Sequence, residues 1–269
     1  MACRWQSPEP SLSDRARIGR GVSNFAGYVR TTASFIRPAV LSLACSMVCG
    51  AAHADPIGLQ WPQPSPGAPI FITYSFSNLL DGTFLLSSPA ELRSATEEAL
   101  RLWASYAPLN FIEVPDSGPA ASDTPYDAEG APQIRIGHHV MSELAHAYYP
   151  GADGLAGDVH FATGIPWTVG VGHWNFLEAV THELGHSLGL AHVVDEPAIM
   201  NPMYPSHRFE GLGTAFLFPS DIRSLQAIYG SGAGSLHSLD AAPEPGSFLL
   251  LGTGLAALAH LRRRRSGSR

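Results

Sequence analysis

The chain has 269 residues, 45% of them hydrophobic, and a formal net charge of −7, so it can bury one mid-sized enzyme domain or two small domains. Residues 55–242 carry five Arg against 20 Asp and Glu, a formal charge of −15, and such an acidic body argues against nucleic acid as a partner, because phosphate binding needs a basic surface. The cysteines, Cys3, Cys45 and Cys49, all lie near the N-terminus, so a body that lacks this region has neither a disulfide framework nor a catalytic thiol.

An export signal is predicted at the N-terminus. Arg37 precedes an apolar run that ends in the small-residue triplet Ala52-His53-Ala54, an order typical of a signal peptide that is cleaved after the last alanine. We therefore expect residues 1–54 to be a signal peptide or leader; its long first part indicates either an extended leader or a later translation start. A membrane anchor is the alternative, but the apolar run is short for a span.

The body, residues 55–232, is expected to form a single α+β domain. The segment 70–76 is rich in β-branched and aromatic residues, which favours a strand. Ser88-Pro89 is a helix start signal, and apolar residues at helical spacing follow it. In chain order we predict a strand at 70–76, a helix at 89–105, strands at 109–114, 133–136 and 158–161, and helices at 176–190 and 218–229.

A metal-binding pattern lies on the second predicted helix, where residues 182–192 read HELGHSLGLAH. His182 and His186 are four residues apart, so both imidazoles project from one helix face and can reach one ion. Gly189 lets the helix end, and the chain can then return His192 as a third ligand. Three protein ligands leave one position open, as a catalytic zinc site requires. A helix that merely exposes histidines to solvent gives no reason for this spacing.

Glu183 follows the first histidine and is predicted to be the catalytic base. Zinc lowers the pKa of bound water to about 7 and polarises a carbonyl group. Glu183 would take the proton of that water and pass it to the leaving amine of a cleaved peptide bond. The predicted cofactor is therefore a catalytic zinc ion, and the predicted reaction is that of a zinc metalloendopeptidase.

The extended pattern H-E-x-x-H-x-x-G-x-x-H resembles the metzincins. That class has a methionine turn beneath the metal, and here Met200 follows His192 by eight residues. The resemblance implies that Met200 packs under the imidazoles without binding the ion, with Met203 as the weaker alternative.

Within the metzincins, the chain is similar to the matrixins from about residue 70 to 230, on the segments 99–114, 144–161 and 221–230. The resemblance implies a zincin-like α+β fold with a twisted, mostly parallel five-stranded sheet over helices. It also implies a cleft between the sheet edge and the zinc, in which an extended peptide binds as an added strand. The segment 202–218 would form the wall of the pocket for the side chain after the cut.

A second, structural zinc is also implied by the matrixin resemblance. Its ligands would be His146 and His160, with either His138 or His139 as a third. The short segment between His139 and His146 lacks the family's His-x-Asp pair and its acidic calcium loop, which makes calcium doubtful. The alternative is that His146 and His160 only form hydrogen bonds within their loop.

The C-terminal residues 233–269 are predicted to be a linker and an address. The triplet 243–245 reads PEP, and an apolar run at 248–261 and four arginines at 262–265 follow it. This order resembles the PEP-CTERM sorting signal of Gram-negative bacteria, which implies export, transient membrane contact and delivery to the cell surface or surrounding matrix. A short tail anchor is the alternative.

The sequence therefore favours a secreted or cell-surface zinc endopeptidase. A non-catalytic matrix or adhesion protein, and an amidase that acts on a cell-wall peptide, are the alternatives; the intact Glu183 favours an enzyme. No cysteine follows residue 50, so the cysteine that caps the zinc in animal matrixin precursors is not expected here. The sequence indicates neither the substrate's side-chain preference nor the oligomeric state.

Overall fold

The computed structural model describes residues 2–5, 59–171, 174–202 and 208–239, and within residues 2–5 the backbone alone. The predicted signal-peptide cleavage site, Met203 and the C-terminal sorting segment lie outside the described residues. No helix in the described ranges is long and apolar enough to cross a bilayer. The strands are β1 (Ala2–Trp5), β2 (Ile70–Phe76), β3 (Leu109–Glu113), β4 (Ile134–His139), β5 (Ala145–Tyr148), β6 (Val159–Ala162) and β7 (Ser235–His237), and the helices are α1 (Pro89–Ala104), α2 (Phe176–Ser187) and α3 (Pro219–Tyr229).

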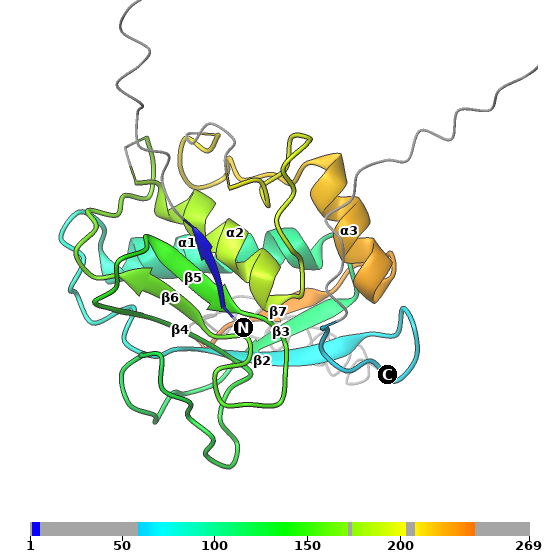
Figure 1. The fold of residues 1–269 in the computed structure, drawn as a ribbon, viewed down its shortest axis with the longest axis horizontal. Coiled ribbons are helices and arrows are strands. Elements are labelled where there is room, and N and C mark those ends of the chain that lie inside the picture. Colours follow the sequence, from blue (N-terminus) through cyan, green and yellow to red (C-terminus); the bar gives the residue numbers. More distant parts are fainter. Residues whose placement is uncertain (1, 6–58, 172–173, 203–207, 240–269) are drawn as a thin grey trace, which may run out of the picture.

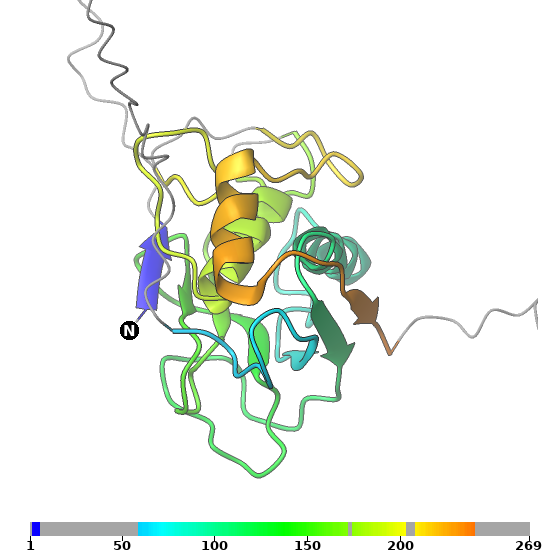
Figure 2. The same cartoon turned by 90° about the vertical axis from the view of Figure 1, so that its right-hand side faces the viewer.

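The strands form one twisted sheet in the order β1-β5-β6-β4-β2-β3-β7. From β6 to β7 all neighbours pair in parallel, whereas β5 is antiparallel to both β6 and β1. The three helices lie together over one face of the sheet (Figures 1 and 2). The predicted α+β class with a mostly parallel sheet is confirmed: β2 to β6 match in number the five strands that the matrixin resemblance implies, and β1 and β7 extend them at the two edges.

The first helix begins where the sequence predicts it. Ser88 Oγ accepts a hydrogen bond from Glu91 N (3.3 Å), and Glu91 Oε2 accepts one from Ser88 N (2.8 Å), so two backbone donors of the helix start are satisfied. At the other end, Trp103 is fully buried and its Nε1 donates to Thr181 O of α2 (3.0 Å). These contacts fix α1 against α2 and connect the sheet's first crossover to the helix with the metal-binding pattern.

The second helix ends at Ser187, three residues before the predicted end at residue 190. Gly189 has a φ of +95°, which side-chain-bearing residues rarely adopt, and a Cβ atom there would lie 2.2 Å from Leu59 O. The sharp turn at Gly189 therefore ends the helix early and reverses the chain. The elements predicted from the residue pattern did not include β1, β5 and β7, which have three or four residues each, although the equally short β6 was predicted.

Candidate metal centre

Helix α2 is enclosed on all sides, since all 12 of its residues are buried. It packs against α1 on one side and against β5 and β6 of the sheet. Asn175 caps its start by accepting a hydrogen bond from Glu178 N (3.2 Å), and Tyr229 donates to Leu188 O at its end (2.9 Å). Polar side chains on such a helix need partners, because an unsatisfied buried polar group costs about 1–3 kcal/mol.

Three histidines converge beside this helix, as the spacing predicts. The Nε2 atoms of His182 and His186 are 3.1 Å apart, and the Nε2 atom of His192 lies 3.2 Å and 3.0 Å from them respectively. His182 and His186 project from α2, whereas His192 comes back from the loop after the turn at Gly189. Two segments of the chain thus place three imidazole nitrogens around one point.

The other nitrogens of the two helical histidines are held by backbone carbonyls. His182 Nδ1 donates to Ile199 O and His186 Nδ1 donates to Leu190 O, both at 2.7 Å. A proton fixed on Nδ1 leaves a lone pair on Nε2. Burial, followed by the neighbouring histidine His192, lowers the pKa of His182 to about 3, and burial holds the pKa of His186 well below its usual range. Both rings are therefore neutral and ready to bind a metal ion.

Converging lone pairs repel one another unless a cation lies between them, so the three histidines fit a metal ion. Three imidazoles with one open tetrahedral position are a donor set that suits catalytic zinc. His182, His186 and His192 thus form the site for the zinc cofactor that the motif predicts.

The buried carboxylate of Glu183 is a second indication that the histidine cluster binds a cation. Its side chain is fully buried, and neither carboxylate oxygen has a hydrogen-bond partner among the described residues. Burial raises the pKa of Glu183 well above its ordinary value. An isolated buried carboxylate is costly, and a nearby cation or water compensates that cost. The sequence places this carboxylate next to His182.

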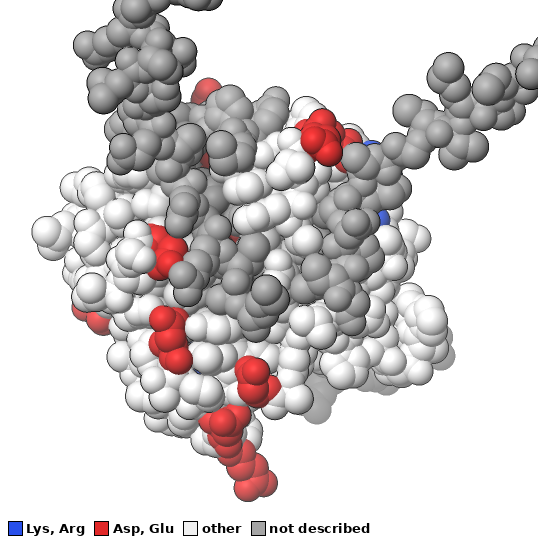
Figure 3. Space-filling model, viewed as in Figure 1, with Lys and Arg blue, Asp and Glu red and all other residues white. Residues whose placement is uncertain are grey.

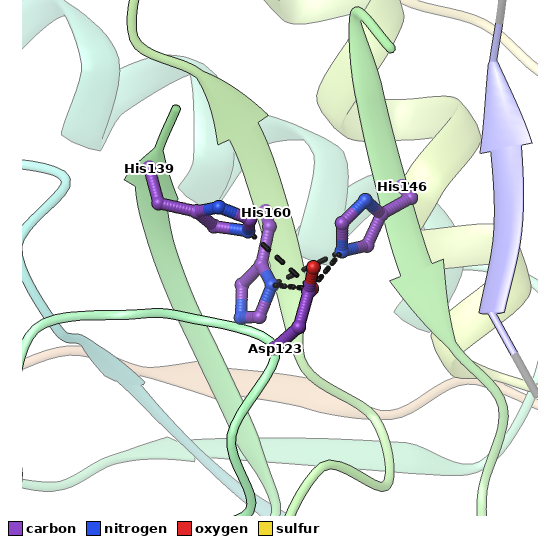
Figure 4. Close-up of side chains that lie close together, drawn as sticks. All are labelled: Asp123, His139, His146 and His160. Atoms are coloured by element: carbon purple, nitrogen blue, oxygen red, sulfur yellow. Dashed lines mark hydrogen bonds and ion pairs between the residues drawn. The ribbon is translucent and has the colours of Figure 1, made fainter. Parts of the chain in front are cut away.

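A second cluster lies among the ends of β4, β5 and β6 (Figure 4). It contains Asp123, His139, His146 and His160, whose ligand atoms lie within 4.8 Å of one another. His146 Nε2 is 3.2 Å from His160 Nδ1 and 3.0 Å from Asp123 Oδ1. The predicted pair His146 and His160 is thus brought together, in a cluster that can hold a second metal ion, and Asp123 joins it without having been predicted.

Of the two candidates for the third histidine, His139 belongs to the cluster and His138 does not. Neighbouring residues of a strand point to opposite faces, so only one of them can face His146 and His160. His138 faces the other way, where its Nε2 lies 3.1 Å from both carboxylate oxygens of Asp81.

The comparison with known families agrees with this geometry. Residues 68–230, more than half of the chain, match the family described as Matrixin. The chain belongs to the matrixin family. Residues 241–265 match a PEP-CTERM protein-sorting motif, which agrees with the C-terminal prediction.

Several animal matrix metalloproteinases are similar to this matrixin. Matrix metalloproteinase-20 of Homo sapiens is 35% identical over 143 residues, which cover 53% of this chain and 29% of the relative. Interstitial collagenase of Bos taurus is 37% identical over 153 residues, again 53% and 29% of the two chains. Matrix metalloproteinase-16 of Homo sapiens is 37% identical over 181 residues, 59% of this chain and 26% of the relative. This matrixin spans less than a third of the length of each of them.

The turn after the zinc motif is held by a residue that sequence analysis missed. Asp221, fully buried on α3, accepts hydrogen bonds from Ile199 N (2.8 Å), Met200 N (3.1 Å) and Phe218 N (2.9 Å). The carbonyl of Ile199 in turn accepts the hydrogen bond from His182. Asp221 therefore positions a zinc ligand of this matrixin through one turn of backbone. In the sequence it is one residue of the predicted helix at 218–229, and no local pattern distinguishes it there.

Met200 lies against the same helix turn as the histidines. Its side chain is buried, and a Cβ atom built on Gly185 would come within 2.3 Å of Met200 Sδ. Gly185 stands directly before His186, so the sulfur packs on the helix where the absence of a side chain leaves room. The methionine turn under the imidazoles stays a prediction, with which this packing is compatible.

The matrixin's metal centre lies beside the antiparallel edge of the sheet. The ring of Tyr149, directly after β5, packs edge-on against His186 at 5.6 Å between centroids. Of the predicted pocket wall at 202–218, residues 203–207 lie outside the described residues. The segment 208–218 is tied to α2 by a buried ion pair, in which Arg208 Nε lies 3.2 Å from Glu178 Oε1. Glu178 stands one helical turn before His182 on α2.

Proposed function

We propose that this matrixin is an exported zinc-dependent endopeptidase in which Glu183 is the general base. One observation carries the proposal: a fully buried carboxylate with no partner among the described residues stands next to a cluster of three converging histidines. A structural zinc site would leave no reason to bury that charge. General bases are kept in such surroundings because burial brings their pKa closer to the working pH.

The proposed mechanism divides the work between the ion and the protein. A zinc ion held by His182, His186 and His192 would supply Lewis acidity, which polarises the scissile carbonyl and acidifies water. The Glu183 carboxylate removes a proton from the water whose oxygen attacks the carbonyl carbon. Glu183 then delivers this proton to the amide nitrogen as the carbon–nitrogen bond breaks, which gives a carboxylic acid and an amine.

The substrate is proposed to bind as an extended strand along β5. This edge accepts such a partner, because β1 pairs with it in antiparallel register from Ala2 opposite Tyr148 to Trp5 opposite Ala145 (Figures 1 and 2). Main-chain pairing provides affinity that is independent of sequence, and pockets select the side chains. The side chain after the cut would enter a pocket walled by the segment 202–218, which the Glu178–Arg208 pair ties to α2.

We further propose that both ends of the chain are processing and sorting signals. Cleavage after Ala54 would remove β1 and free the β5 edge in a catalytic domain at residues 55–232, whose sheet β7 extends just beyond that range. The C-terminal residues 233–269, with their sorting motif, would direct the protein to the cell surface or the surrounding matrix. Acidic side chains are scattered over the face shown in Figure 3 and basic ones are scarce there, which suits protein or peptide substrates rather than nucleic acid.

The test is a cleavage assay on purified residues 55–242 with casein and quenched fluorescent peptides, alongside zinc analysis. We expect cleavage that a chelator stops, and its loss in Glu183→Ala with zinc still bound. The exposed Glu129→Ala variant is the matched control, because it removes the same charge outside both histidine clusters and outside the predicted pocket wall. Full activity in Glu183→Ala would overturn the mechanism. Bound zinc without cleavage of any peptide would instead favour a cell-wall amide substrate or a binding role.

A further inference from the structure

We propose that Glu98 of α1 is a positioning residue for substrate selection, because it holds the turn at 211–215 in the wall segment, residues 208–218. The inference deepens the proposed function and rests on it for the role of that wall. No motif in the sequence marks Glu98, which stands 115 residues before Gly213, the first residue of the turn that it contacts. Its importance follows from the backbone groups that its carboxylate binds.

Both carboxylate oxygens of Glu98 accept hydrogen bonds from the backbone of the wall segment. Gly213 N donates to Glu98 Oε2 (2.7 Å), and Ala215 N donates to Glu98 Oε1 (3.2 Å). Hydrogen bonds to an ionised acceptor are roughly twice as strong as those between neutral groups. Glu98 therefore ties two alternate residues of the turn to a helix.

The turn itself is built in a way that makes such a tie useful. Gly211 has a φ of +139° and Gly213 a φ of +83°, and glycine loses more conformational freedom on ordering than any other residue. Thr214 Oγ1 accepts hydrogen bonds from Glu210 N (2.9 Å) and Gly211 N (3.2 Å), which closes the turn on itself. These local bonds set the shape of the turn, whereas Glu98 sets its place on the domain.

The two ends of the wall segment are anchored on the other helices. At its start, Phe209 O accepts a hydrogen bond from Asn175 Nδ2 at the beginning of α2 (2.7 Å). At its end, Phe218 N donates to Asp221 of α3 (2.9 Å). Glu98 connects the middle of the segment to α1, and α1 packs against α2. The three helices thus hold the wall as one frame.

The contact at Ala215 bears on the surface that the wall would offer to a substrate side chain. The next residue is Phe216, whose side chain is 40% exposed. Its ring packs between those of Phe209 and Phe218, at 5.4 Å and 5.1 Å between centroids. A shift at Ala215 would move this ring. Loss of Glu98 should therefore change which side chain the pocket accepts, while the zinc ligands, positioned by α2 and the turns after it, keep their places.

The first experiment measures amide hydrogen exchange in the full chain, purified after export, in a Glu183→Ala background that removes any effect of catalysis. We expect exchange in the segment 210–216 to be at least ~10-fold faster in the additional Glu98→Ala variant, because two amides lose a charged acceptor. Glu98→Gln keeps one acceptor oxygen and should recover part of the protection. Glu129→Ala, an exposed glutamate in a different loop, should leave the exchange unchanged.

The second experiment measures selectivity in the active full chain with two quenched peptides that differ only in the residue after the cut, leucine or alanine. Glu98→Ala should bring the ratio of their kcat/KM values several-fold closer to one, with a larger change in KM than in kcat. Glu98→Gln should lie between Glu98→Ala and the wild type. Zinc content should be equal in all variants.

Unchanged exchange in Glu98→Ala would overturn the anchoring role, and faster exchange with an unchanged peptide ratio would refute the link to the pocket. An equal loss of kcat for both peptides would indicate damage to the metal centre and would also overturn the proposal. Absence of any peptide cleavage by the wild-type chain would contradict the proposed function, and the exchange rates would still decide whether Glu98 holds the turn.

Discussion

The two histidine clusters of this matrixin are built in opposite ways. The catalytic cluster takes all its ligands from 11 consecutive residues, and two of the three rings are oriented by backbone carbonyls. The second cluster takes one residue from each of four segments, and its acid is the exposed Asp123. The catalytic cluster needs only the helix and the turns that follow it in the chain, whereas the second cluster exists only after the sheet has brought distant segments together. The first cluster should therefore control chemistry and the second should control stability and the cleft edge.

The largest expected effect is the loss of hydrolysis when a ligand of the catalytic cluster is removed, and it separates the catalytic from the structural cluster. His186→Ala removes a ligand of the catalytic ion, so peptide hydrolysis by residues 55–242 should fall to background. His160→Ala should cost about 1–3 kcal/mol of unfolding free energy, because it removes a buried ring from the second cluster, while catalysis at low temperature persists. Steady-state kinetics and thermal unfolding measure the two effects. Equal loss of activity in both variants would abolish the distinction between the clusters.

A somewhat smaller effect is expected from Asp221, the residue that links α3 to the catalytic cluster. Asp221→Ala leaves three buried backbone donors without their acceptor, each worth about 1–3 kcal/mol if nothing replaces it. His182 would also lose the fixed position of Ile199 O, so kcat should fall more than KM changes. Asp221→Asn keeps one acceptor oxygen and should recover part of the stability. If Asp221→Ala matched the wild-type kcat, the turn would not position His182.

The comparison also explains which parts of this molecule could be predicted from its sequence. His182, Glu183, His186 and His192 could be predicted because their chemistry depends on spacing along one short segment, a helix and the turn that follows it. Asp123 stands in a loop rich in Pro, Asp and Ser, and no local pattern distinguishes it from Asp127. Its role follows from the pairing of β4, β5 and β6, which brings distant segments together.

The secondary structure could likewise be predicted only where the signal is local. Long elements such as α1 and β2 carry a clear period and were predicted almost to the residue. The strand β5, with four residues, exists because its two edges find partners, and that information is not local. The choice of His139 over His138 likewise depends on which face of β4 looks toward β5, which a sequence alone does not give.

The contact between Met200 and Gly185 of α2 can be tested for its effect on stability and on the affinity for the catalytic ion. Gly185→Ala places a methyl group 2.3 Å from Met200 Sδ, so Met200 or the helix must shift. Overpacking of this kind costs about 1–3 kcal/mol, and it should lower the affinity for the catalytic ion because Gly185 precedes His186. Combining Gly185→Ala with Met200→Ala should recover part of the loss. Unchanged stability and zinc affinity in the single variant would show that the contact under the histidines is loose.

The smallest expected effect concerns the N-terminal strand and the edge that it shares with substrate. Because β1 pairs with β5 through only four residues, and each hydrogen bond contributes about 0.5–1.5 kcal/mol before the cost of ordering the segment, the tethered strand should compete only weakly with a peptide. Residues 1–242 should show a KM several-fold above that of residues 55–242, at equal kcat. Neighbouring positions alternate between hydrogen-bonded and open pairs in an antiparallel ladder, so either Cys3→Pro or Arg4→Pro removes a donor from the pairing and should restore the lower KM. A KM that is the same with and without residues 1–54 would mean that substrate uses another edge, because two strands cannot occupy one side of β5 at once.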